Sequence, residues 1–147
     1  MATKVLIDTN ILIYAFMQDS VFYTKSREFL QNLIQDEEVE VCIVEKSLFE
    51  MAASLTSPAL SNKVSIAEIK EYLQYLTSEL FTILYSNPQI TATTWRLLFN
   101  LPNRKNRIYD LVLASTAIEN EVEIIYTKNV KDFEDIKEIK IIDPTSE

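Results

Sequence analysis

Short apolar segments rich in β-branched residues alternate along this chain with longer segments whose apolar residues recur at helical spacing. The five strand-like segments lie at residues 3–8, 39–44, 81–85, 122–126 and 138–142. Strands that alternate with helices form βαβ units, in which the strands run parallel and the helices cover both faces of the sheet. The sequence therefore predicts a three-layer α/β/α fold with a mostly parallel five-stranded sheet.

Helix starts are marked in the sequence by capping signals. The predicted helices cover residues 22–34, 45–55, 65–78, 91–101 and 108–118. Ser65 with Glu68 matches the capping box, in which a serine and a glutamate satisfy the free amides at a helix start. Ser47 with Glu50 matches the same pattern, so a capping role for Glu50 competes with any role in chemistry.

The absence of glycine and histidine excludes several classes of active site. Without glycine, neither a Walker A loop nor the glycine-rich dinucleotide turn can form. Without histidine, serine–histidine–aspartate triads, cysteine–histidine pairs and histidine-bearing zinc sites are excluded as well. Enzymatic chemistry would have to rest on carboxylates, hydroxyls, amides, lysine and arginine. Carboxylates that hold a hard cation such as Mg²⁺ or Mn²⁺ are the leading candidate.

The length and hydropathy of the chain predict one domain, spanning residues 1–147, without internal repeats or linkers. The longest unbroken apolar run, Ile11 to Met17, is far below the roughly 18 residues of a membrane span. No basic-then-apolar leader opens the sequence, so we expect a cytoplasmic protein without a membrane segment. The single cysteine, Cys42, lies in an apolar segment and is expected to be a buried thiol.

The net charge of −8 argues against a large nucleic-acid-binding face, because phosphate contacts normally need clustered basic residues. Any such contact should be local. The densest basic cluster is formed by Arg104, Lys105 and Arg107, shortly before Asp110. This cluster is a candidate to receive a phosphodiester backbone. A solvated loop is the alternative.

Three carboxylates are candidates for the site, and each has a structural alternative. Asp8 ends the first strand, where a charge beside a core is either paired, bound to a metal or used as a helix N-cap. Glu50 lies in the helix after the second strand. Asp110 falls in the first turn of its helix, where the helix dipole alone favours a carboxylate, but Ala114 and Ala117 on the same face would let that helix approach the sheet.

The polar segment from Thr127 to Asp132 follows the fourth predicted strand. In open parallel sheets, ligands gather at the carboxyl ends of the strands, where the strand order reverses. Asp8 and this segment would meet at that edge. By composition alone it is also an ordinary surface loop.

Taken together, these features resemble the PIN domain, and in size and pattern the VapC-type toxins of prokaryotic toxin–antitoxin pairs. The resemblance covers almost the whole chain. It rests on four segments in order: residues 5–10, Glu50 after the second strand, residues 110–114 and residues 125–133. The family fold is a parallel sheet between helices, with acidic residues that meet in one pocket.

The resemblance implies a ribonuclease that hydrolyses RNA phosphodiester bonds with Mg²⁺ or Mn²⁺. The implied metal ligands are Asp8, Glu50 and Asp110. The fourth acidic position of the family falls where this chain has Asn129 and the nearby Asp132, which leaves a second metal open. The candidate substrate-contacting residues are Asn10, Thr127, Arg104, Lys105 and Arg107, of which the first two would also support Asp8 by hydrogen bonds. The implied partners are RNA, an antitoxin that inserts a segment near the active site, and a second copy in a homodimer.

Two other functions fit parts of the sequence. A PIN-like domain that has lost catalysis would act as a binding module, and Asn129 in place of an acidic residue would be its sign. An α/β domain whose Asp8 accepts a phosphoryl group is the second alternative. A phosphatase of that type usually carries another aspartate two residues on, where this chain has Asn10.

Overall fold

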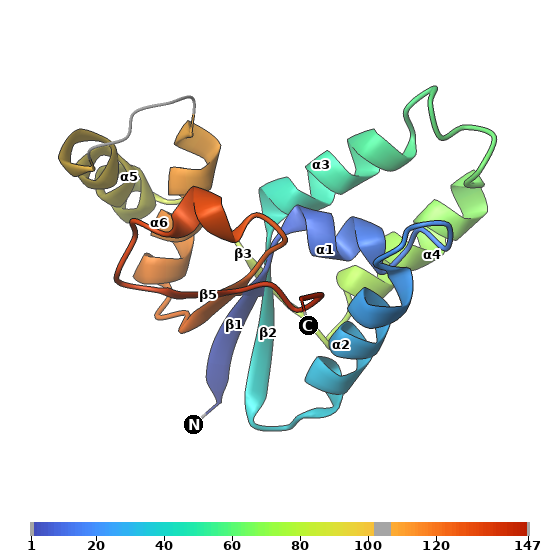
Figure 1. Cartoon of the computed structure of the whole chain (residues 1–147), viewed down its shortest axis with the longest axis horizontal. Helices are drawn as coiled ribbons and strands as arrows, with labels where there is room; N and C mark the ends of the chain where they lie inside the picture. Colours follow the sequence, from blue (N-terminus) through green and yellow to red (C-terminus); the bar gives the residue numbers. More distant parts are fainter. Residues whose placement is uncertain (1, 102–106, 147) are drawn as a thin grey trace.

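The computed structural model describes residues 2–101 and 107–146, and Figure 1 shows them as one sheet with helices on both sides. All neighbouring strands pair in parallel. The strand order is β3-β2-β1-β4-β5. The strands are β1 (Thr3–Ile7), β2 (Val39–Val44), β3 (Thr82–Leu84), β4 (Ile124–Tyr126) and β5 (Lys140–Ile142).

The helices form the two outer layers. One face of the sheet is covered by α1 (Thr9–Tyr14), α2 (Tyr23–Gln35), α3 (Glu45–Leu55) and α4 (Ile66–Leu76). The other face is covered by α5 (Pro88–Asn100), α6 (Ile108–Glu119) and the short 3-10 helix η1 (Val130–Phe133). The predicted α/β/α architecture with a five-stranded sheet is therefore confirmed. None of the helices in the described part of the chain is long and apolar enough to cross a bilayer.

The central strand β1 divides its side chains between two cores. Val5 and Ile7 pack into the core under α1 to α4, and Leu6 packs into the core under α5 and α6. Full burial of each such side chain contributes about 1.5–3 kcal/mol to folding. From β1, the chain adds β2 and β3 on one side of the sheet and then β4 and β5 on the other, so the strand order reverses beside β1. The residues that follow β1 and β4 therefore lie at the position where parallel sheets bind ligands.

The two predicted capping boxes have different outcomes. Ser65 and Glu68 form theirs, with the Glu68 amide donating to Ser65 Oγ at 3.1 Å and the Ser65 amide to Glu68 Oε1 at 3.4 Å. The predicted box of Ser47 and Glu50 is wrong. α3 begins directly after β2 at Glu45, so Ser47 lies buried inside its first turn. Glu50 is thereby released from a capping role.

Other predicted boundaries shift by a few residues. The third to fifth strands are shorter than predicted, and a short helix, α1, occupies the apolar segment after Asp8. α5 begins at Pro88 rather than at residue 91, because Asn87 caps it by accepting the Ile90 amide at 3.0 Å. Proline at the first helical position is favourable, since its missing amide is not needed there.

After the end of α6 the backbone adopts a left-handed conformation at Glu121 (φ 59°). Glycine usually occupies such a position, but this chain contains no glycine. The turn is closed by the Val122 amide, which donates to the Ala117 carbonyl at 2.9 Å. We expect Glu121→Gly to raise the free energy of unfolding by about 0.5–1 kcal/mol, because glycine adopts this conformation without steric cost. Urea denaturation measures the change. The matched variant Glu123→Gly, in extended backbone before β4, should be neutral or destabilising, and equal effects of the two variants would contradict the strain at Glu121.

Candidate active site

Asp8 lies at the carboxyl end of β1 and caps α1. Its backbone amide donates to the Tyr126 carbonyl at 2.9 Å, which continues the pairing of β1 with β4. Its Oδ1 accepts the Thr9 amide at 2.7 Å. The sequence left two roles open for Asp8, a helix N-cap and a metal ligand. The two roles are compatible, because the cap uses Oδ1 and does not involve Oδ2.

Thr127 and Asn10 hold the second oxygen of Asp8. The Thr127 hydroxyl, fully buried after β4, donates to Asp8 Oδ2 at 2.7 Å. Asn10 Nδ2 lies 3.5 Å from Asp8 Oδ2 and 3.4 Å from Thr127 Oγ1, and Asn10 Oδ1 accepts the Lys128 amide at 3.3 Å. These contacts tie the end of β1 to the end of β4. They fix the orientation of the Asp8 carboxylate, as expected for supporting residues.

Asp8, Glu50 and Asp110 line one pocket of about 300 Å³, although they belong to different parts of the chain. Glu50 comes from α3 on one side of the sheet and Asp110 from the first turn of α6 on the other. Ala114 and Ala117 are fully buried, so α6 packs closely on the sheet as their small size predicted. The pocket opens at the carboxyl ends of the central strands.

Burial and mutual repulsion raise the pKa of two of these carboxylates. For Asp8, burial is the main cause, hydrogen bonds from Thr127 and Thr9 oppose it, and the charges of Glu50 and Asp132 add to it. Burial is also the main cause of the raised pKa of Asp110, followed by the charges of Asp132 and Asp8. A cation in the pocket would relieve both effects, because it offsets the lost hydration and the repulsion.

The donor set of the pocket suits a hard divalent cation. Carboxylate oxygens are the ligands that Mg²⁺ and Mn²⁺ prefer. Across residues 2–101 and 107–146, no three acidic or cysteine side chains already stand in an arrangement that would enclose an ion. Glu50 accounts for part of this, because its side chain is 52% exposed and lies 4.0 Å from Lys46. Asp8 and Asp110 are half-buried, whereas Glu50 is exposed.

Two residues, Asn129 and Asp132, are candidates for the fourth acidic position of the PIN family. Asn129 lines the pocket, and its backbone amide donates to Thr127 Oγ1 at 3.1 Å. Asp132 is exposed and does not line the pocket, yet its charge raises the pKa of both Asp8 and Asp110. The pocket lining therefore contains the Asn129 amide, and the Asp132 carboxylate outside the lining acts on Asp8 and Asp110 through its charge.

The predicted basic cluster contributes less to the pocket than expected. Arg104 and Lys105 lie outside the described residues. Arg107 pairs with Asp135 through contacts of 2.6 and 2.8 Å and also donates to the Asp132 carbonyl at 2.8 Å. Its side chain is 10% exposed. In this arrangement Arg107 holds η1 and the segment after it against the start of α6, rather than lining the pocket.

Sequence reasoning missed two residues at the mouth of the pocket, Lys46 and Tyr109. Lys46 Nζ lies 3.3 Å from the centre of the Tyr109 ring. They are separated by more than 60 positions in the printed sequence, so no local pattern connects them. The available signal was positional, because Lys46 lies two residues after the end of β2 and Tyr109 directly precedes Asp110.

The sequence model of the PIN domain matches residues 5–139. This chain belongs to the PIN domain family. A curated relative, Ribonuclease VapC24 of Mycobacterium tuberculosis, is 27% identical over 139 residues, which cover 94% of both chains. This PIN domain chain thus spans nearly the full length of that relative.

Solved structures agree on the fold. VapBC-1 from nontypeable Haemophilus influenzae matches with a TM-score of 0.70 and 21% identity, covering 98% of this chain and 100% of that one. VapBC2 from Rickettsia felis, solved with a promoter DNA fragment, matches with a TM-score of 0.68 and 20% identity, covering 95% and 98%. VapC20 of Mycobacterium tuberculosis, a toxin that cleaves the sarcin–ricin loop, has a TM-score of 0.66 at 8% identity, covering 87% and 92%. At these identities the structures establish the PIN-like α/β/α fold of this chain.

Proposed function

We propose that this PIN domain is a divalent-metal-dependent endoribonuclease and the toxin of a type II toxin–antitoxin pair. The observation that carries the proposal is the convergence of Asp8, Glu50 and Asp110, from three separate elements, in one pocket. The curated relative is named a ribonuclease, and several structural neighbours are toxin–antitoxin complexes. Their activity and their assemblies support the same assignment here.

The residues of the pocket have distinct tasks in this proposal. Asp8 and Asp110 would bind the cation directly, and Glu50 would bind it or position a water molecule. Thr127 and Asn10 hold Asp8 in place through the contacts described above. Once bound, the cation would lower the pKa of a coordinated water and neutralise negative charge that develops on the phosphate. Asn129 at the wall offers an amide to a substrate oxygen.

The proposed partners are RNA, an antitoxin and a second copy of the chain. A groove of about 490 Å³ between α1, α2 and α4 is lined by Phe16, Tyr23 and Arg27, among others, and offers an apolar and charged surface to a protein segment. Phe22, in contrast, is half-buried against Tyr14, with ring centres 5.0 Å apart. A short gene for a DNA-binding protein directly beside the gene of this chain would support the toxin assignment.

Metal binding and RNA cleavage should appear together in the purified chain. We expect Mg²⁺ or Mn²⁺ at 100 times its dissociation constant to stabilise the fold by about 2.7 kcal/mol. Thermal melts with and without the metal measure this shift. The same additions should switch on cleavage of single-stranded RNA, and EDTA should abolish it, as followed on gels with end-labelled substrates.

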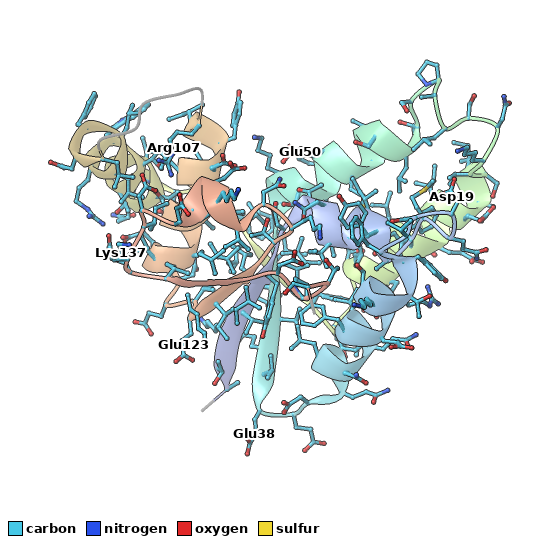
Figure 2. All side chains as sticks on the ribbon, in the orientation of Figure 1. Asp19, Glu38, Glu50, Arg107, Glu123 and Lys137 are labelled. Atoms are coloured by element: carbon cyan, nitrogen blue, oxygen red, sulfur yellow. The ribbon has the colours of Figure 1, made fainter. Side chains whose placement is uncertain are left out.

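The matched control for both measurements is Asp19→Asn, an exposed carboxylate paired with Lys63 and well away from Glu50 in Figure 2. This variant should keep the metal response and the activity. If the wild-type chain neither gains stability with metal nor cleaves any of a varied set of RNAs, the alternative of a binding module that has lost catalysis holds. Asn129, at the position where the family has an acidic residue, is the observation that favours that alternative.

A further inference from the structure

The mouth of the carboxylate pocket carries an aromatic side chain that has no role in the proposed metal binding or cleavage. Tyr109 is 68% exposed and lines the pocket directly before Asp110. It is the only aromatic among the described residues that line this pocket. A tyrosine combines an apolar ring with a polar hydroxyl, so at a wet pocket mouth its ring is available to contact a ligand.

Lys46 fixes one face of the Tyr109 ring. Its ammonium lies 3.3 Å from the ring centre, within the range of a cation–π contact. Because one face is covered by the lysine while most of the residue stays exposed, the remaining ring surface is open to solvent. Lys46 is also the only cation among the described lining residues, and it lies 4.0 Å from Glu50. The pocket mouth therefore combines one open aromatic surface with one positive charge.

We infer that Tyr109 stacks on an unpaired nucleobase of the RNA beside the scissile phosphate, while Lys46 binds an adjoining phosphate. This inference rests on the proposed ribonuclease function and assigns two contacts to the RNA that lie outside the carboxylate set. Stacking needs the face of a base, which is hidden in a duplex and accessible in a single strand. It also suits a chain with a net charge of −8, because stacking contributes affinity without requiring a broad basic surface.

Steady-state kinetics on a single-stranded RNA with the metal present test the role of each residue. Tyr109→Ala should raise KM by about tenfold or more, with most of the loss in KM rather than in kcat. Tyr109→Phe keeps the ring and should return KM close to the wild-type value. Lys46→Gln should reduce the slope of log KM against log salt by about 0.7, the share of one phosphate contact on a single strand. Phe99→Ala is the matched control, since Phe99 is also 68% exposed but lies outside the pocket.

A binding measurement tests base stacking by Tyr109 independently of RNA cleavage. The chain has a single tryptophan, Trp95, so the triple variant Asp8→Asn, Trp95→Phe and Tyr109→Trp carries its only indole at the proposed stacking position. A single-stranded oligoribonucleotide should quench its fluorescence. A sugar-phosphate oligomer of the same length without bases should not.

The outcomes are distinguishable. If the wild-type chain cleaves RNA but Tyr109→Ala leaves KM unchanged, or if the oligomer without bases quenches equally, the stacking role is wrong while the ribonuclease stands. If the wild-type chain cleaves nothing and RNA still quenches the probe, the base site stands without the nuclease. If neither cleavage nor quenching occurs, both proposals are overturned.

Discussion

Asp8→Asn is expected to lower RNA cleavage by about a thousandfold and to leave the fold intact. Loss of a charged metal ligand removes several kcal/mol of stabilisation from the transition state, and each 1.36 kcal/mol is tenfold in rate. Asparagine keeps an oxygen that can accept the Thr9 amide, so the cap of α1 is preserved. Single-turnover cleavage assays at saturating metal measure the loss.

Asp110→Asn should produce a loss of similar size, and Glu50→Gln a smaller one. Asp8 and Asp110 have raised pKa values caused first by burial, whereas the Glu50 side chain is 52% exposed and close to Lys46. The order of the three losses is therefore a test of the site geometry. An equal loss in Asp19→Asn, outside the pocket, would show that the assay responds to charge in general and would contradict the assignment.

The metal-free stability of Asp8→Asn distinguishes loss of chemistry from loss of fold. Because the pKa of Asp8 is raised in the folded state, its protonated form contributes stability below the unfolded pKa of about 3.8, and this contribution is lost as the pH rises through the folded pKa. At neutral pH the charged form therefore opposes folding. Its neutral replacement should melt at the wild-type temperature or above it without metal, and should lose most of the metal-induced rise.

Sequence patterns predicted the order and type of most helices and strands. The continuous apolar runs of β1 and β2 are buried on both faces of the sheet, as expected for central parallel strands. The capping box of Ser65 and Glu68 forms as predicted. The carboxylate at Asp8 was placed correctly at the end of a strand, but its cap and ligand roles were separable only once both oxygens had partners. Patterns of this kind depend on residues close together in the sequence. They therefore predict where helices and strands lie better than they predict which side chains touch across the fold.

The contacts that shape the pocket mouth depend on long-range packing. The box predicted for Ser47 and Glu50 failed because β2 passes into α3 without a loop, which no short motif reports. The contact of Lys46 with Tyr109 joins helices from opposite sides of the sheet. A basic cluster in the sequence likewise does not reveal whether its charges face solvent or are paired within the fold.

Arg107 shows the consequence of such pairing, and Arg107→Ala is expected to lower the free energy of unfolding by about 2–3 kcal/mol. Its guanidinium makes a two-point contact with Asp135 and donates to the Asp132 carbonyl, with only 10% of the side chain exposed. Removing one partner of a poorly solvated ion pair leaves the other charge uncompensated. Arg96→Ala is the matched control. Its pair with Glu138 is about half exposed, at 49% and 45%, and should contribute less than about 1 kcal/mol.

The pH dependence of this pair has a defined direction. The hydrogen bond and charge of Arg107 lower the pKa of Asp135 below 3.8. The pair therefore contributes stability above the unfolded pKa, and this contribution is lost as the pH falls through the folded pKa. The stability gap between the wild-type chain and Asp135→Asn, measured by urea denaturation, should be present at pH 7 and should narrow as the pH falls below 3.8.

The same pair should affect catalysis through position rather than contact. Arg107 stands at the N-cap position of α6, three residues before Asp110, without a side-chain capping hydrogen bond. Its guanidinium holds that end of the helix against the segment with Asp132. Without it, Asp110 is expected to shift in the pocket, so folded Arg107→Ala should show a reduced kcat that higher metal concentrations partly restore. Full activity in the folded variant would show that α6 keeps Asp110 in place without the pair.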